Sequence, residues 1–126
     1  AEALQAEAGL DIHPGEVVSG LPYGIRKKIE VVRALASRPK LLLLDEPAAG
    51  LNPSETAELA RFLRRIAASG TTLLVVEHDM GFVNEVCDRV VVLNFGRRIF
   101  EGSMADARAD AQVREAYLGA GAADAA

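Results

Sequence analysis

Hydrophobic and polar positions follow two different rhythms along the chain, and these rhythms predict alternating helices and strands. From Gly24 to Ser37, apolar residues recur at steps of three and four, which predicts a helix with one buried face. The residues of that face are Ile25, Ile29, Val32 and Ala36. Uninterrupted aliphatic runs at Lys40–Leu44 and Thr71–Val76 predict strands buried on both faces, as in a parallel sheet.

Capping and turn residues predict the remaining elements. Asn52 can cap a helix, Pro53 suits the first helical position, and Glu55 stands where a capping box places a carboxylate. The predicted apolar stripe of this helix comprises Leu59, Phe62, Leu63 and Ile66, and Gly70 ends it. The other predicted elements are helices at Glu2–Ala8 and Gly81–Asp88, a hairpin at Val90–Phe100, and a last helix from Ser103 toward Leu118, before a frayed tail from Gly119. This order predicts an α/β layered fold with a mainly parallel sheet core and a C-terminal hairpin and helix.

Composition narrows the class of protein. Half of the 126 residues are hydrophobic and a quarter are charged, which is typical of a folded globular chain. The longest all-aliphatic runs hold four residues, whereas a membrane helix needs ~20. The formal charge of −4 argues against binding nucleic acid by bulk electrostatics. We interpret the basic run Arg26–Lys28 as a solvated helix face. The single cysteine excludes an internal disulfide.

The strongest chemical signal follows the first aliphatic strand. Asp45 and Glu46 stand at its carboxyl end, the edge at which open α/β sheets bind ligands. Adjacent strand residues point to opposite sides, so the two carboxylates have different roles. One carboxylate on Mg²⁺ and one polarising a water is the arrangement that phosphoryl transfer requires. His78 follows the second strand and could contact a terminal phosphate at the same edge. The alternative interpretation is that Asp45 and Glu46 only begin an acidic surface turn and that His78 is an ordinary polar residue after a strand.

These motifs resemble those of the ATP-binding cassette (ABC) family. Leu41–Pro47 is similar to its Walker B strand, Ala48–Pro53 to its D-loop, and Glu77–Asp79 to its switch histidine segment. The family's signature motif aligns with Leu21–Ile25, where Leu21 and Gly24 match. Tyr23 in the third signature position, Phe100–Ser103 and Glu115–Gly119 resemble a subgroup, the ATPase subunits of branched-chain amino-acid uptake systems.

The resemblance implies roles for individual residues. Asp45 would help to hold Mg²⁺, Glu46 would act as general base, and His78 would sense the γ-phosphate of ATP. The residues implied to contact nucleotide are Leu21, Tyr23, Gly24 and Asn52. The implied partners are a second ABC ATPase subunit, as a homodimer or heterodimer, and a transmembrane permease, without nucleic acid. The implied location is cytoplasmic, peripheral on the inner face of the cell membrane.

One motif of the family is missing from these 126 residues. A phosphate-binding loop reads Gly-x-x-x-x-Gly-Lys-[Ser/Thr], and the Gly15–Gly20 segment has the glycine spacing without the lysine or hydroxyl. The chain therefore resembles the C-terminal half of a cassette, which implies a partial P-loop NTPase-like layered fold. Because it begins with Ala1, we expect a segment upstream. We predict that the chain alone does not hydrolyse ATP. We also expect Leu41–Leu44 to expose a hydrophobic edge, which leads to self-association or partial disorder unless a partner covers it.

The resemblance divides the chain into three parts. These are residues 1–23 as the end of a helical signature subdomain, 24–103 as the C-terminal part of the ATPase core, and 104–126 as a terminal helix and tail. Two alternative functions remain open. The first is a non-catalytic truncated cassette that acts as an interaction module. The second is a DNA-repair-type ABC ATPase head, although no coiled-coil heptads occur.

Overall fold

The computed structural model describes residues 2–13 and 15–118. The chain divides into two compact units between Val86 and Cys87, and each unit is described by itself. Among the described residues, every helix is too short or too polar to cross a membrane.

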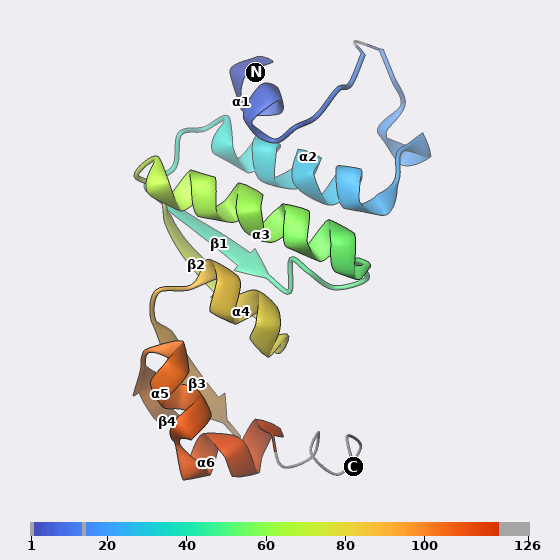
Figure 1. Cartoon of the computed structure of the whole chain (residues 1–126). Coiled ribbons are helices and arrows are strands. Elements are labelled where there is room, and N and C mark those ends of the chain that lie inside the picture. Colours follow the sequence, from blue (N-terminus) through green and yellow to red (C-terminus); the bar gives the residue numbers. More distant parts are fainter. Residues whose placement is uncertain (1, 14, 119–126) are drawn as a thin grey trace. The chain divides into compact units, whose positions relative to one another are not determined.

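The first unit combines helices with a two-stranded parallel sheet (Figure 1). Its elements are α1 (Glu2–Glu7), η1 (Val18–Gly20), α2 (Tyr23–Leu35), β1 (Leu41–Asp45), α3 (Pro53–Ala68), β2 (Thr72–Val76) and α4 (Met80–Val86). The register pairs Leu41 with Thr72 and Asp45 with Val76, so the two strands end together. The predicted parallel pairing is confirmed.

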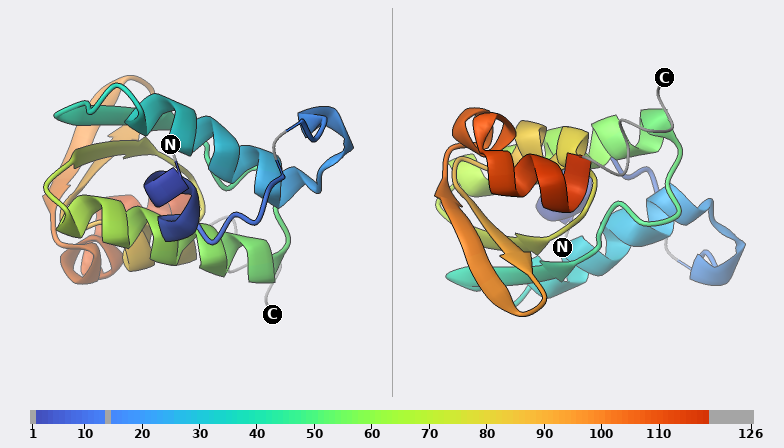
Figure 2. Two further views of the ribbon diagram at one scale, coloured as in Figure 1. Left: turned by 90° about the horizontal axis from the view of Figure 1, so that it is seen from above. Right: turned by 90° about the horizontal axis from the view of Figure 1, so that it is seen from below.

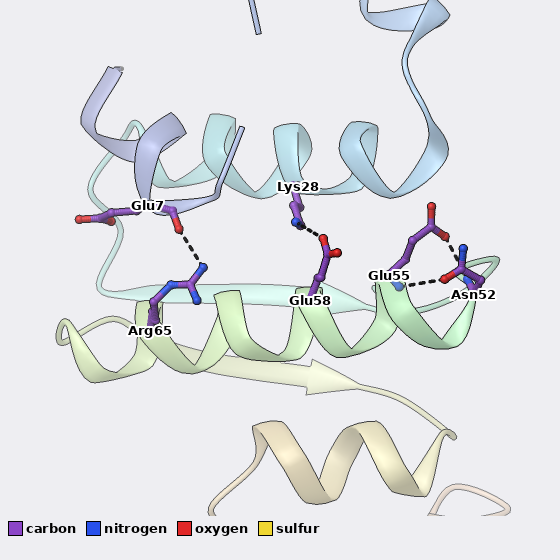
Figure 3. Close-up of polar contacts among 6 residues, drawn as sticks. All are labelled: Glu7, Lys28, Asn52, Glu55, Glu58 and Arg65. Atoms are coloured by element: carbon purple, nitrogen blue, oxygen red, sulfur yellow. Dashed lines mark hydrogen bonds and ion pairs between the residues drawn. The ribbon is translucent and has the colours of Figure 1, made fainter. Parts of the chain in front are cut away.

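Helix α3 is the central helix of this unit and begins as its sequence predicts. The Asn52 side chain accepts a hydrogen bond from the Glu55 backbone N–H at 2.9 Å, and the Glu55 carboxylate accepts one from the Asn52 N–H at 3.0 Å (Figure 3). The residues of its predicted stripe are all buried: Leu59, Phe62, Leu63 and Ile66. Arg65 donates to the Glu7 carbonyl at 2.9 Å, which joins α1 to α3 (Figure 3).

The buried face of α2 differs from the predicted one. The buried residues are Gly24, Lys28, Val31, Val32 and Leu35, whereas Ile25 and Ile29 are half-buried and Ala36 is exposed. Lys28 is only 7% exposed, so the interpretation of Arg26–Lys28 as a solvated face is wrong for this residue. Its ammonium lies 2.8 Å from the Glu58 carboxylate of α3 (Figure 3). The neighbouring helix supplies the partner that a buried cation needs, which periodicity on α2 alone cannot reveal.

The sheet has one covered and one open face, so the prediction of strands buried on both faces is wrong. Leu42 is buried, while the neighbouring Leu41 and Leu43 are 52% and 65% exposed. On β2, Leu74 and Val76 are 57% and 59% exposed. The register places Leu43 beside Leu74 and Asp45 beside Val76, so these side chains share one face. We call Leu41, Leu43, Leu74 and Val76 the open apolar face.

The second unit is the predicted hairpin with helices packed on it (Figure 2). Its elements are β3 (Val90–Asn94), β4 (Arg97–Gly102), α5 (Met104–Ala109), α6 (Ala111–Val113) and a π-helical turn, η2 (Arg114–Leu118). The predicted last helix is interrupted, because Asp110 is extended and its carboxylate caps the Val113 N–H at 3.0 Å. Arg89 and Arg98 bind Glu101 at 2.6 and 2.7 Å and lower the pKa of its carboxyl group. The predicted tail from Gly119 lies outside the described residues.

Candidate nucleotide site

The carboxyl ends of β1 and β2 form the edge at which the predicted catalytic residues meet. The Glu46 N–H donates to the Val76 carbonyl at 2.8 Å, which extends the pairing of the strands by one residue. The two loops that leave the sheet, one after β1 and one after β2, therefore start side by side. This is the place where an open parallel sheet offers its loops to a ligand.

Glu46 and His78 lie close together at this edge. His78 Nδ1 is 3.4 Å from Glu46 Oε1, and the two side chains are 72% and 53% exposed. Glu46 has a positive φ of 45°, an uncommon conformation for a residue with a side chain. A strained backbone at a residue with reactive chemistry is frequent at functional sites. The structure thus brings the predicted base and the predicted phosphate sensor within reach of one bound anion.

Asp45 lies on the open side of the sheet. As the last residue of β1 it pairs with Val76 and shares the open apolar face, where its side chain is exposed. Within residues 2–13 and 15–118, no three His, Cys, Asp or Glu side chains cluster as a metal site. Magnesium bound with a nucleotide commonly uses one or two carboxylates, with phosphate and water completing the shell. Asp45 fits such a partial ligand set and does not by itself form a metal cage.

The predicted nucleotide contacts gather at the starts of α2 and α3. A Cβ built on Gly50 would lie 3.0 Å from the Tyr23 ring, and one built on Gly24 would lie 2.9 Å from the Glu55 carboxylate. Gly50 also has a φ of +77°. Asn52 is engaged in the α3 capping box. Tyr23, Gly24 and Asn52 thus belong to one packed corner.

The start of α2 carries no side-chain cap. Its N-cap is Pro22, which makes no side-chain capping bond. The first backbone N–H groups of a helix attract anions when no side chain caps them. Leu21, half-buried, directly precedes this start. The guanidinium of Arg26 and the ammonium of Lys27 lie 5.3 and 5.5 Å from the centre of the Tyr23 ring. These cations add positive charge beside the helix start.

Glu77 is a residue of this edge whose contacts the sequence did not predict. Its carboxylate accepts a hydrogen bond from the Ala48 N–H at 2.9 Å and others from the N–H groups of His78 and Asp79 at 3.2 and 3.5 Å. In the sequence it is only the residue between a strand and the candidate histidine. A carboxylate at a strand end, next to the candidate histidine, is the one signal that could have drawn attention to it.

Comparison with known proteins agrees with the fold and the motifs. The structure superimposes on the ADP conformation of MJ1267, an ATP-binding cassette of an ABC transporter, with a TM-score of 0.84 and 28% identity over 93% of this chain and 48% of that one. A nucleotide-free ATP-binding cassette from an ABC transporter gives a TM-score of 0.83 with 27% identity, covering 92% of this chain and 47% of that one. The chain is therefore similar in fold to the C-terminal part of an ATP-binding cassette domain.

Among proteins with such a domain, the sequence is similar to ATP-binding proteins of branched-chain amino-acid transport. A family described as "Branched-chain amino acid ATP-binding cassette transporter" matches residues 97–123. The high-affinity branched-chain amino acid transport ATP-binding protein LivG of Salmonella typhimurium is 40% identical over 88% of this chain and 44% of its own length. BraF of Pseudomonas aeruginosa, of the same description, is 40% identical over 79% of this chain and 39% of its own length. The chain thus spans less than half the length of these relatives.

Proposed function

We propose that this chain is part of an ATP-hydrolysing subunit that powers the import of branched-chain amino acids. The observation that carries the proposal is the approach of Glu46 and His78 to 3.4 Å at the shared end of two parallel strands. In that position one group can take a proton from water while the other contacts the phosphate under attack. The similarity to LivG and BraF supports the branched-chain amino-acid substrate.

In this proposal each residue of the edge has one task. Glu46 is the general base that orients a water and accepts its proton. His78 donates a hydrogen bond from its imidazole to the terminal phosphate. Asp45 contributes one carboxylate to Mg²⁺, which neutralises phosphate charge when it is bound with ATP. The uncapped start of α2, with Leu21, Tyr23, Gly24 and Asn52 around it, contacts the nucleotide held by a second ATPase subunit.

The proposed site needs residues beyond these 126. They include no phosphate-binding loop, whose charge-assisted bonds are worth about 1.5–3 kcal/mol each. Asp45 and the open apolar face stand on one side of the sheet, so a segment that covers this face could also complete the metal site. We propose that the rest of a cassette does so, and that the subunit lies in the cytoplasm against a membrane permease.

Two measurements test the proposed function. Isothermal titration of the 126-residue chain with Mg-ATP is expected to show no saturable binding up to about 1 mM. A dissociation constant of about 1 mM corresponds to a binding free energy of roughly −4 kcal/mol. The complete cassette that contains this chain is expected to hydrolyse ATP. When it is reconstituted with its permease, leucine should stimulate hydrolysis and ribose should not. An inactive complete cassette would contradict the ATPase proposal, and stimulation by ribose alone would contradict the substrate.

A non-catalytic interaction module is the second candidate. The open apolar face favours it, because a chain with this much exposed aliphatic surface is suited to bind another protein. The two candidates differ in one outcome. A catalytic cassette loses ATP turnover when Glu46 is replaced, whereas an interaction module binds its partner equally well with or without that carboxylate.

A further inference from the structure

We propose that Glu77 is a positioning residue that joins the loop carrying His78 to the turn after β1, and thereby sets the approach of His78 to Glu46. The inference rests on the proposed function for its catalytic meaning. The claim that Glu77 holds the two loops together does not depend on that function and can be tested separately.

The contacts of Glu77 divide between two segments of the chain. One carboxylate oxygen, Oε1, accepts the Ala48 N–H at 2.9 Å, on the turn that follows Glu46. The other oxygen, Oε2, accepts the His78 N–H at 3.2 Å and the Asp79 N–H at 3.5 Å, on the loop after β2. Hydrogen bonds to an ionised acceptor are stronger than neutral ones. A single half-buried side chain therefore links two loops that are 29 residues apart in sequence.

Each linked segment also contains a local hydrogen bond of its own. On the turn after β1, the Ala49 N–H donates to the Glu46 carbonyl at 3.1 Å, so a shift of Ala48 is transmitted to Glu46. On the loop after β2, the Asp79 carboxylate accepts the Phe82 N–H at 3.0 Å at the start of α4. The Glu77 side chain connects the turn after β1 to the loop after β2.

The Glu46–His78 pair is too exposed to hold itself in place. Exposed ion pairs contribute little to stability, since water screens them and both side chains lose rotamer freedom. The two side chains are 53% and 72% exposed. Their approach is therefore set by the backbone on which they stand, and Glu77 is the residue that joins the two backbones beyond the end of the strand pairing.

The chemistry of the donors explains why a glutamate fits here. All three groups that face the side chain are N–H donors, and a carboxylate offers an acceptor oxygen to each segment. A glutamine can keep one oxygen but must turn an NH₂ group toward the donors of the other segment. Glu77→Gln should therefore hold one loop only, and Glu77→Ala should release both.

Histidine resonances provide a direct test in the full chain. The sequence has two histidines, so the ring signals of His78 and His13 can be assigned, and His13 serves as an internal reference. In the wild-type background, Glu46→Gln should shift the His78 ring signals and leave those of His13 unchanged. In the Glu77→Ala background, the same Glu46→Gln change should move the His78 signals less than a third as far. Equal shifts in both backgrounds would overturn the proposal.

Matched variants separate positioning from loss of folding or charge. Glu85→Gln removes the same charge from an exposed site on α4 and should preserve the full response of His78 to Glu46→Gln. Glu77→Gln should give an intermediate response. If Glu77→Ala shifts the His13 signals or lowers helical circular dichroism, the Glu77→Gln variant decides, and a full response in that variant contradicts the proposal.

Steady-state kinetics of the complete cassette test whether Glu77 affects catalysis. Glu77→Ala should lower kcat at least tenfold and change the KM for ATP less than twofold, because the residues that contact the rest of the nucleotide stay in place while the Glu46 carboxylate and the His78 imidazole separate. Glu77→Gln should recover part of the loss. An unchanged kcat in an active cassette would overturn the positioning role. An inactive wild-type cassette would instead overturn the proposed function and leave the histidine result standing.

Discussion

At the scale of single residues, Glu46 combines a strained backbone with an exposed carboxylate. Its φ is 45°, and the left-handed region costs a residue with a side chain about 1–2 kcal/mol. We expect Glu46→Gln to lower kcat of the complete cassette by about 10²–10⁴, the usual contribution of a general base, with nucleotide affinity retained. Phosphate release and binding of a fluorescent ATP analogue measure the two effects.

Replacement of Glu46 by glycine separates stability from activity. Glycine adopts positive φ freely but loses more chain entropy on folding, so the two effects nearly cancel. Glu46→Gly should abolish turnover while the free energy of unfolding stays equal or rises by up to about 1 kcal/mol. Arg38→Gly, at an exposed position with a φ of 51°, is the control. It should change the free energy of unfolding as Glu46→Gly does and leave turnover unchanged. A clear loss of stability in Glu46→Gly would show that its side chain is structurally required.

Gly24 shows a second residue whose identity has a local steric reason. A Cβ at this position would lie 2.9 Å from the Glu55 carboxylate, which is committed to the α3 capping box. Gly24→Ala should therefore displace Glu55 and weaken that cap by about 0.5–1 kcal/mol, which offsets the gain of similar size that alanine brings inside a helix. Gly20→Ala, where nothing lies within 4 Å, has no such cost and should be the more stable of the two variants. Urea unfolding followed by circular dichroism compares the two variants.

At the scale of elements, the Lys28–Glu58 pair decides how α2 packs on α3. Lys28 is buried, whereas the Glu58 side chain is 49% exposed, so the two partners are not equivalent. Glu58→Gln leaves a buried cation without its counter-charge, which is costly. Lys28→Met keeps the shape and leaves a carboxylate that water can solvate. We expect urea unfolding to show Lys28→Met within about 1 kcal/mol of wild type and Glu58→Gln clearly less stable. The reverse order would contradict this account.

The Lys28–Glu58 pair also predicts how the stability of the folded chain changes as the pH falls. The hydrogen bond from Lys28 and its positive charge lower the pKa of Glu58 below its ordinary value. A depressed carboxyl pKa stabilises the folded state at neutral pH, and this stabilisation is lost as the pH falls below about 4. Lys28→Met should remove that part of the pH dependence, so its unfolding midpoint should decline less steeply in acid. Thermal scans between neutral pH and acid test the difference.

At the scale of the whole molecule, the open apolar face should govern association. Four aliphatic side chains on it are 52–65% exposed: Leu41, Leu43, Leu74 and Val76. Apolar surface on a sheet favours contact with another chain. Sedimentation velocity of the 126-residue chain should show self-association, and the double variant Leu43→Thr/Leu74→Thr should shift it toward monomer. Val17→Thr, at an exposed site outside the sheet, should not. A monomeric wild-type chain would contradict the prediction.

Most of the first unit could be predicted because its signals are local. The α3 capping box depends on residues within one helical turn, and the parallel pairing of β1 with β2 follows from two aliphatic runs with a helix between them. The approach of Glu46 to His78 was predictable from strand direction, since parallel strands end at one edge. The buried Lys28 was not predictable, because it depends on a partner from another helix. The break at Asp110 was missed although its cap on Val113 is as local as the cap of α3.

The position of Asp45, Glu46 and His78 at one edge of the sheet followed from the sequence alone, because strand direction and residue order suffice to place them. How that edge is held together depends on contacts that form only in the folded chain. Glu77 links Ala48 to His78 and Asp79, a contact between segments that no periodicity connects. The tertiary structure also decided which sheet face is open, since burial depends on what packs against a strand as well as on how apolar the strand is.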